Sequence, residues 1–232
     1  MSVFTTLEFT CPDCGATMEY ENYASINADR RPDLRDEVFN GSLSRVHCEA
    51  CNKDFRPEPN LNYLDYKTGN WIMAKPIYSI AHWDLEEAKA TTLFEAAYGA
   101  GAPSSAREIG DALTPRLTFG WPAFREKLVL KEAGLDDLMI ERTKLTIAAN
   151  RPGNPIQPGV ELRVLDVREQ AFRMAWIDAT TGENLQQFDI QRALYESTAN
   201  AEDWAEIDKK LNAGIFLDIQ RTFIEPEPVE EG

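Results

Sequence analysis

Cys11-Pro-Asp-Cys14 and Cys48-Glu-Ala-Cys51 are two cysteine pairs of identical spacing, and they contain all four cysteines of this 232-residue chain. Two residues between cysteines let one tight turn direct both sulfurs at a single ion. Two such turns predict a tetrahedral metal site with these four ligands. Zn²⁺ suits the site because thiolates are soft ligands and four protein ligands leave no position for water, so we expect a structural zinc ion.

Iron is the main alternative to zinc at these cysteines. Four thiolates, with Gly15 directly after the first pair, also resemble rubredoxin, in which the metal carries one electron. Asn52 follows the second pair and also tolerates a left-handed conformation, so the turns do not separate the two metals. Disulfides are disfavoured in a cytoplasmic chain of this length. His47 is expected to neighbour the site and not to bind the metal, because four thiolates already complete it.

Short strands are predicted on both sides of each cysteine pair, which is typical of a zinc ribbon made of two β-hairpins. The hairpins are separated by residues 22–42, which contain Asp29-Arg-Arg-Pro-Asp33 and Asn40-Gly41. We therefore predict a long polar insert that ends in a turn. The strands are expected at residues 3–9, 16–21 and 43–47, and around Phe55.

The middle of the chain is predicted to form one further β-hairpin and then helices. Residues 61–66 and 71–73 flank a turn at 67–70. Asp84 is expected to cap a helix that ends at Gly99, and a short helix follows at 106–113. Two longer helices are predicted over residues 121–133 and from an Asp136 cap to about 148, and their short link favours an antiparallel helical hairpin.

Residues 150–158 contain three prolines and one glycine and form the clearest internal boundary. Alternating segments at 160–167, 172–177 and 185–190 then predict an antiparallel β-meander, followed by helices. The predicted fold class is α+β. Four segments are expected: a zinc-ribbon domain 1–76, a helical segment 77–150, a β-meander with helices 151–224, and a disordered acidic tail 225–232.

The charge balance argues against nucleic-acid binding. The chain has 24 Lys plus Arg against 39 Asp plus Glu, and residues 1–76 alone have 8 against 12. Phosphate backbones require clustered cations, which this composition does not provide. No segment has the roughly 18 to 20 apolar residues that a membrane span needs, and residues 1–10 lack the pattern of a signal peptide. We therefore expect a cytoplasmic protein.

Several motifs are similar to those of one protein family. Cys11-Pro-Asp-Cys14-Gly15, Asn40-Gly-Ser-Leu43 and Tyr63-Leu-Asp-Tyr66 resemble the CpXC family, and so does the helical part with Phe119-Gly-Trp-Pro-Ala-Phe-Arg-Glu-Lys127 and Ala133-Gly-Leu-Asp-Asp137. The resemblance covers roughly residues 11–145. The second cysteine pair departs from the pattern because it lacks a proline. The family implies a zinc-binding domain and no defined activity.

The leading functional hypothesis is a module that binds a protein partner. Tyr63, Tyr66 and Trp71, together with Arg30, Arg31 and Arg35 in the insert, are residue types that dominate many interfaces. The same aromatic residues are equally suited to covering the small core of a ribbon. The oligomeric state is not predictable from these features.

An enzyme is the alternative hypothesis, and it rests on charged residues of the helical hairpin. Carboxylates there suit a hard cation or the acid/base pair of a hydrolase, whereas ordinary ion pairs would make the same residues a solvated helix face. No catalytic motif is present, and only two histidines occur. The charged set comprises Arg125-Glu-Lys127, Asp136, Asp137, Glu141 and Lys144.

Overall fold

The central element of the computed structural model is a mixed five-stranded sheet with the strand order β1-β2-β5-β6-β7. The structure describes residues 2–150, 159–199 and 204–228. The pairs β1/β2 and β5/β6 are antiparallel, whereas β2/β5 and β6/β7 are parallel. The strands are β1 (Val3–Thr10), β2 (Thr17–Asn27), β5 (Leu61–Asp65), β6 (Asn70–Lys75) and β7 (Thr114–Phe119).

Each cysteine pair lies in the turn of a hairpin, as the sequence predicts. The first turn joins β1 to β2, and the second joins β3 (Val46–Cys48) to β4 (Lys53–Phe55). The predicted hairpin at 61–73 is also present as β5 and β6. The sequence assigns no strand to residues 114–119, yet β7 extends the central sheet there.

The prediction of a polar excursion over residues 22–42 is wrong. Strand β2 continues to Asn27, and helix α1 (Pro32–Asn40) follows. The proline lies at the first helical turn, where its missing N–H costs nothing, and Gly41 ends the helix with a φ of 78°. Leu34 and Val38, one turn apart, are both buried and pack α1 against the core.

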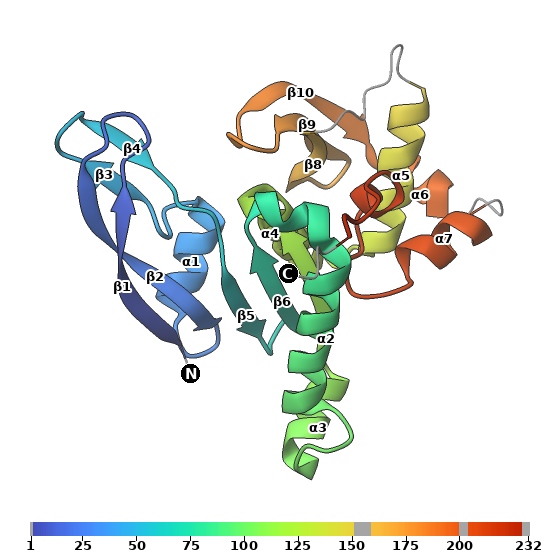
Figure 1. The fold of residues 1–232 in the computed structure, drawn as a ribbon. Coiled ribbons are helices and arrows are strands. Elements are labelled where there is room, and N and C mark those ends of the chain that lie inside the picture. Colours follow the sequence, from blue (N-terminus) through green and yellow to red (C-terminus); the bar gives the residue numbers. More distant parts are fainter. Residues whose placement is uncertain (1, 151–158, 200–203, 229–232) are drawn as a thin grey trace.

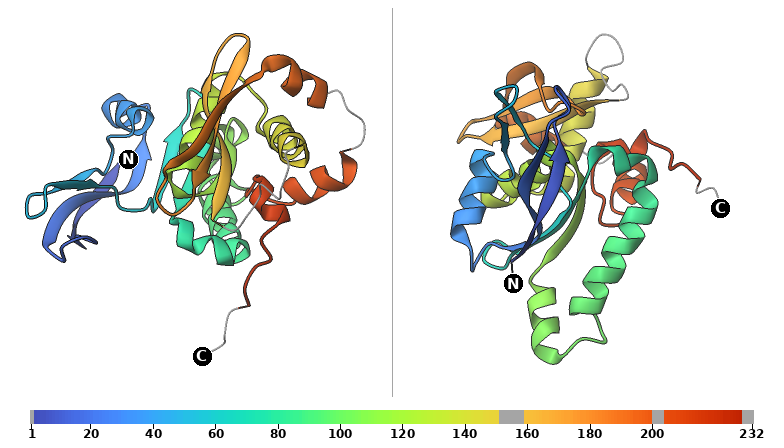
Figure 2. Two further views of the ribbon diagram at one scale, coloured as in Figure 1. Left: turned by 90° about the horizontal axis from the view of Figure 1, so that it is seen from above. Right: turned by 60° about the vertical axis from the view of Figure 1, so that its left-hand side comes forward.

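Helices α2 (Trp83–Tyr98) and α3 (Ser104–Asp111) project away from the central sheet (Figure 2). Asp84 is not the N-cap of α2, because the 3-10 helix η1 (Ile77–His82) runs directly into the helix at Trp83. Asp84 lies instead in the first turn, where the helix dipole favours a carboxylate. The predicted end of α2 at Gly99 is confirmed.

Two long helices follow at α4 (Gly120–Glu132) and α5 (Asp137–Ala149), close to the predicted bounds. Asp136 caps α5, since its Oδ1 accepts hydrogen bonds from Leu138 N at 2.8 Å and Met139 N at 3.2 Å. The predicted β-meander is confirmed as an antiparallel sheet of order β10-β9-β8. Its strands and the elements after them are β8 (Val160–Val167), β9 (Ala171–Asp178), β10 (Asn184–Gln191), α6 (Arg192–Ala199), α7 (Ala205–Leu211) and η2 (Ile219–Thr222).

The hydrophobic core explains where two predicted interface residues lie. Tyr63 and Trp71 are 0% and 2% exposed, so they do not present their rings to a partner. Tyr63 packs edge-on against Phe124 of α4 with the ring centroids 5.5 Å apart. Tyr66, next to the β5–β6 turn, is 51% exposed. The aromatic residues of this hairpin therefore serve mainly the core of the central sheet, which is larger than a ribbon core.

The hairpins β1/β2 and β3/β4 form one end of the molecule with α1, and α5–α7 lie at the opposite end (Figure 1). The division at residues 76 and 150 stays a prediction, and the central sheet takes strands from both sides of residue 76. Residues 151–158 of the predicted boundary and 229–232 of the predicted tail lie outside the described residues. Within the described ranges, no helix is both long and apolar enough to cross a membrane.

Candidate metal centre

The two hairpin turns bring four sulfur atoms together at the end of the molecule. The Sγ atoms of Cys11, Cys14, Cys48 and Cys51 all lie within 4.8 Å of one another. Cys11 Sγ is 3.7 Å from Cys51 Sγ, and Cys14 Sγ is 3.7 Å from Cys48 Sγ. A disulfide requires about 2.0 Å between sulfurs, so these contacts are not disulfides. A tetrahedron with metal–sulfur bonds of about 2.3 Å has sulfur–sulfur edges of about 3.8 Å, which the two separations of 3.7 Å match.

The two turns have the same backbone geometry. Gly15 N donates a hydrogen bond to Cys11 O at 2.9 Å, and Asn52 N donates one to Cys48 O at 2.7 Å. The residue after each pair is left-handed, with φ of 74° at Gly15 and 57° at Asn52. Glycine and asparagine adopt this conformation at the lowest cost, so each turn closes directly behind its second cysteine.

The electrostatics of the cluster favour a bound cation. Burial tends to raise the pKa of Cys11, but backbone N–H groups of Cys14 and Asp13 offset it and lower that pKa to about 7. Burial and the neighbouring sulfurs raise the pKa of Cys51 to about 12. Adjacent thiols resist simultaneous ionisation because the resulting thiolates repel one another. A positive ion at the centre removes that repulsion.

Polar neighbours of the cysteines lie outside the four-sulfur cluster. His47 is half exposed, and its Nδ1 is 2.7 Å from Asp54 Oδ1 on the opposite strand. Lys53 forms an ion pair with Asp13, which ties the second hairpin to the turn of the first. The Lys53–Asp13 pair thus joins the two hairpins, and the four sulfurs form a group that could hold a metal ion.

A comparison with protein families places these features in a known group. The family model described as "CpXC protein" matches residues 9–144, which is more than half of the chain. The chain belongs to the CpXC family. The resemblance drawn from the sequence motifs is therefore confirmed, and all four cysteines lie inside the matched region. No curated protein and no solved structure matches the chain.

The CpXC match also contains most of a second cluster, which is ionic and buried. Lys144 Nζ donates to Glu126 Oε2 at 2.7 Å and to Glu141 Oε1 at 2.9 Å, and all three side chains are 0% exposed. Arg163 Nη1 on β8 lies 3.1 Å from Glu126 Oε2 and 2.5 Å from Asp218 Oδ2. The cluster joins α4, α5, β8 and the start of η2.

The expected ion pair between Glu141 and Lys144 is present, and Asp136 is exposed, but the expectation of a solvated face is wrong for the four buried members of the set, Glu126, Lys127, Glu141 and Lys144. The carboxylate oxygens of Glu126, Glu141 and Asp218 approach within 4.8 Å of one another, as metal ligands would. The Lys144 ammonium and the Arg163 guanidinium already supply the positive charge at these oxygens. Glu126 and Glu141 have no exposed side-chain surface, so a substrate in solution does not reach these two of the four carboxylates in the charged set. Asp136 is exposed and Asp137 is partly exposed.

Sequence reasoning missed Arg163 and Asp218, which complete this cluster. Glu161 and Arg163 alternate with apolar residues along β8, and both are 2% exposed. Charged side chains on the buried face of a strand need partners, and that requirement was the only available signal. Asp218 gives no comparable signal, because it lies outside any regular pattern before η2.

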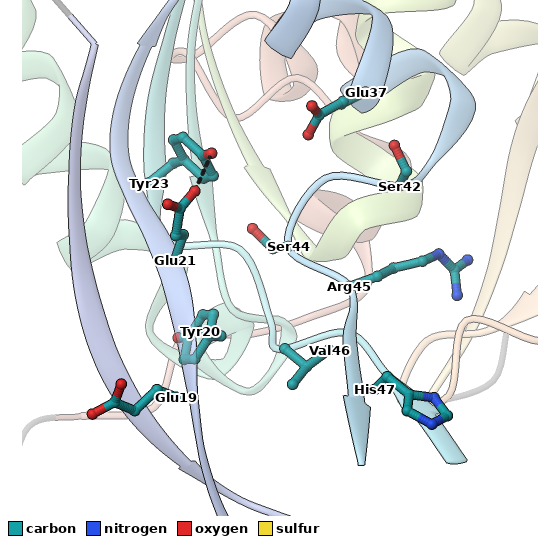
Figure 3. A pocket seen from close by; sticks show the side chains of 10 residues that line it. All are labelled: Glu19, Tyr20, Glu21, Tyr23, Glu37, Ser42, Ser44, Arg45, Val46 and His47. Atoms are coloured by element: carbon teal, nitrogen blue, oxygen red, sulfur yellow. Dashed lines mark hydrogen bonds between the residues drawn. The ribbon is translucent and has the colours of Figure 1, made fainter. Parts of the chain in front are cut away.

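A polar hollow of about 370 Å³ lies beside the cysteine hairpins, between β2 and residues 42–47 (Figure 3). Tyr23 OH donates to Glu21 Oε2 at 2.8 Å inside it. Figure 3 shows that Arg45 and His47 extend away from this pair. The polar side chains do not converge on one point, so the hollow lacks the arrangement of a catalytic site.

Proposed function

We propose that this CpXC chain holds one structural Zn²⁺ through Cys11, Cys14, Cys48 and Cys51. The observation that carries the proposal is the pair of 3.7 Å sulfur–sulfur separations, because they match the edges of a tetrahedral thiolate site. Four thiolates fill the coordination shell, so the ion has no open position for a substrate. The two hairpins would then form a zinc ribbon.

The zinc ion contributes to folding and not to a reaction in this proposal. Strands β3 and β4 have three residues each and form their own two-stranded sheet. A hairpin of that size is not stable alone in water. Metal bonds that close both turns supply the missing stabilisation, so metal binding and folding of this end are coupled.

Metal analysis of the purified chain tests this site. We expect about one zinc per chain in the wild type, and loss of that zinc in Cys11→Ser and Cys48→Ser. His47→Ala is the matched control, because it lies next to a ligand but outside the sulfur cluster, and it should keep full occupancy. Full zinc occupancy in both serine variants would refute the site. Visible absorption typical of ferric thiolate would show that the bound metal is iron and not zinc.

We infer further that the zinc-stabilised end is a cytoplasmic protein-interaction module. Among the described strands, β1 is paired only with β2, and Val3, Phe4 and Leu7 are 44%, 52% and 43% exposed. An edge strand with apolar side chains is suited to pairing with an extended segment of another protein. The acidic composition supports a protein partner over nucleic acid.

Affinity capture from the native cytosol tests the interaction. Leu7→Lys places a charge on the β1 edge and should release a partner that the wild type recovers. Leu185→Lys is the matched control, since Leu185 is 55% exposed on β10, an edge strand of the three-stranded sheet. Equal recovery of the partner with Leu7→Lys and with the wild type would show that the interface does not include β1.

A further inference from the structure

A cavity of about 350 Å³ lies between the segment before α2 and the C-terminal sheet. One wall comes from Glu58, Ile77 and Ile80, which precede α2 within the CpXC match. The other wall comes from Gly159, Glu161, Ala179 and Thr180 in and next to the meander, and from Gln220 and Ile224 after it. Because this second wall follows residue 144, the cavity combines the family region with the part of the chain beyond it.

Two glutamates contribute to the largely apolar lining of the cavity. Among the described residues that line the cavity, Glu58 and Glu161 carry the only charged side chains, and isoleucines at positions 77, 80 and 224 supply apolar surface. Small-ligand sites commonly have volumes of about 300 Å³ or more and combine apolar walls with a few placed polar groups. The cavity meets both criteria.

Glu161 has one oxygen that its protein neighbours leave unsatisfied. Its Oε2 accepts from Arg163 Nε at 2.9 Å, whereas its buried Oε1 has no hydrogen-bond partner in the described structure. The residue as a whole is 2% exposed. A buried carboxylate oxygen without a partner costs free energy, so this atom is suited to accept a hydrogen bond from a ligand.

Glu58 adds a second negative charge to the same cavity. Its Oε2 accepts from Ile77 N at 3.0 Å. Burial raises the pKa of Glu58, and the charge of Glu161 raises it further. Burial also raises the pKa of Glu161. The Glu161 carboxylate thus disfavours the ionised form of Glu58, and a cation placed near both carboxylates offsets this effect.

We propose that this cavity binds a small organic amine, with its ammonium group donating to Glu161 Oε1 and its apolar body packed against Ile77, Ile80 and Ile224. Glu58 supplies the second charge that selects a cation over a neutral or anionic molecule of the same shape. The proposal does not depend on the metal at the cysteines. The ammonium comes either from a free amine or from a lysine side chain, which carries the same group on an apolar stem.

An NMR titration of the ¹⁵N-labelled, zinc-loaded full chain tests the cavity with three probes of similar shape. 2-Phenylethylamine is the cation, 2-phenylethanol is neutral, and 3-phenylpropionate is an anion. We expect the amine to shift the amide signals of Gly159 and Thr180 and to bind at least about tenfold more tightly than the other two, because only it makes a charge-assisted hydrogen bond. Equal affinities, no binding, or shifts confined to other regions would overturn the proposal.

Variants connect the binding to the two carboxylates. Glu161→Gln and Glu58→Gln should each weaken amine binding by about tenfold, since both keep the side-chain shape and remove one charge. Glu58→Gln keeps the test decisive if Glu161→Gln fails to fold, because Glu58 lies outside the buried ion pairs. Glu183→Gln, in the exposed β9–β10 turn, is the matched control and should leave binding unchanged. Unchanged binding in the folded cavity variants would refute the site.

A further arm separates the two sources of the ammonium group. Acetyl-Gly-Lys-Gly-amide presents a lysine side chain without a free amino terminus. Shifts at Gly159 and Thr180 with this peptide, lost in Glu58→Gln, would assign the cavity to a lysine of a protein. Shifts with 2-phenylethylamine alone would assign it to a free amine. Failure of both probes contradicts the proposal.

Discussion

Lys144 and Glu126 form an ion pair of 2.7 Å in which neither side chain has any exposed surface. The two residues come from different helices, α5 and α4, and the pair lies inside a larger set of charges. Glu126 Oε1 also accepts from Val164 N of β8 at 2.6 Å, and Glu141 Oε2 accepts from Ile219 N of η2 at 3.0 Å. The ionic cluster thus joins the helices of the CpXC region to the C-terminal part of the chain.

Removing Lys144 should destabilise the protein strongly. Lys144→Met leaves the buried carboxylates of Glu126 and Glu141 short of one cation, which costs about 3–5 kcal/mol. Lys89→Met is the control, because Lys89 is exposed where it pairs with Glu86 at 2.6 Å, and its loss should cost under about 1 kcal/mol. Urea unfolding measures both free energies, and equal effects would contradict a structural role for the cluster.

The stabilising effect of Asp137 should depend on pH. Burial alone would raise the pKa of Asp137, but Lys127 and Arg116 hold that pKa well below its ordinary 3.8. The carboxylate therefore stabilises the fold above the ordinary pKa, and this contribution disappears as the pH falls through the lower, folded-state pKa. Asp137→Asn should cost about 2–4 kcal/mol at pH 7.

Urea unfolding of the wild type and Asp137→Asn between pH 7 and pH 2 measures this difference. The difference in the free energy of unfolding between the two proteins should stay constant down to about pH 5 and become smaller below about pH 4, since the other titrating groups are common to both. Asp136→Asn serves as a comparison, because asparagine also caps helices well and should change stability little. A difference in unfolding free energy that does not depend on pH would show that the Asp137 ion pairs are not its cause.

The left-handed residue behind each cysteine turn should control metal affinity. Asn52 has a φ of 57° and an exposed side chain, so substitutions there test backbone strain without disturbing the core. Asn52→Gly should preserve zinc affinity. Asn52→Val should weaken it about tenfold, because a β-branched residue pays roughly 1–2 kcal/mol in this conformation. Competition with a chelator gives both affinities, and equal values would show that the turn does not need this conformation.

Loss of the metal should unfold one end of the molecule before the other. Cys48→Ser should remove hydrogen-exchange protection from β3 and β4 and from the ends of β1 and β2 near the first turn. Strands β8–β10 should keep their protection, since their core forms with α4 and α5. A uniform loss of protection along the chain would contradict the local role of the metal.

Local patterns were sufficient for much of the fold. The spacing of the cysteines placed both pairs in hairpin turns, Asp136 marked a helix start, and alternation predicted β8, β9 and β10. Each of these features depends on residues within a few positions of one another, so the sequence carries the complete signal. Helix α1 was missed because polar residues at its start resemble a loop, although Leu34 and Val38 mark its buried face.

The sequence by itself determined the four-cysteine cluster and the α+β class. Only the tertiary structure decided the environment of the charged residues. Glu126 and Glu141 meet Lys144 within the helical hairpin. Arg163 lies 37 positions from its partner Glu126 in the sequence, and Asp218 lies 55 positions from Arg163, so these two residues complete the cluster only after folding. A charged helix face looks the same in sequence whether water or distant partners cover it, because burial depends on contacts between segments that no local pattern records.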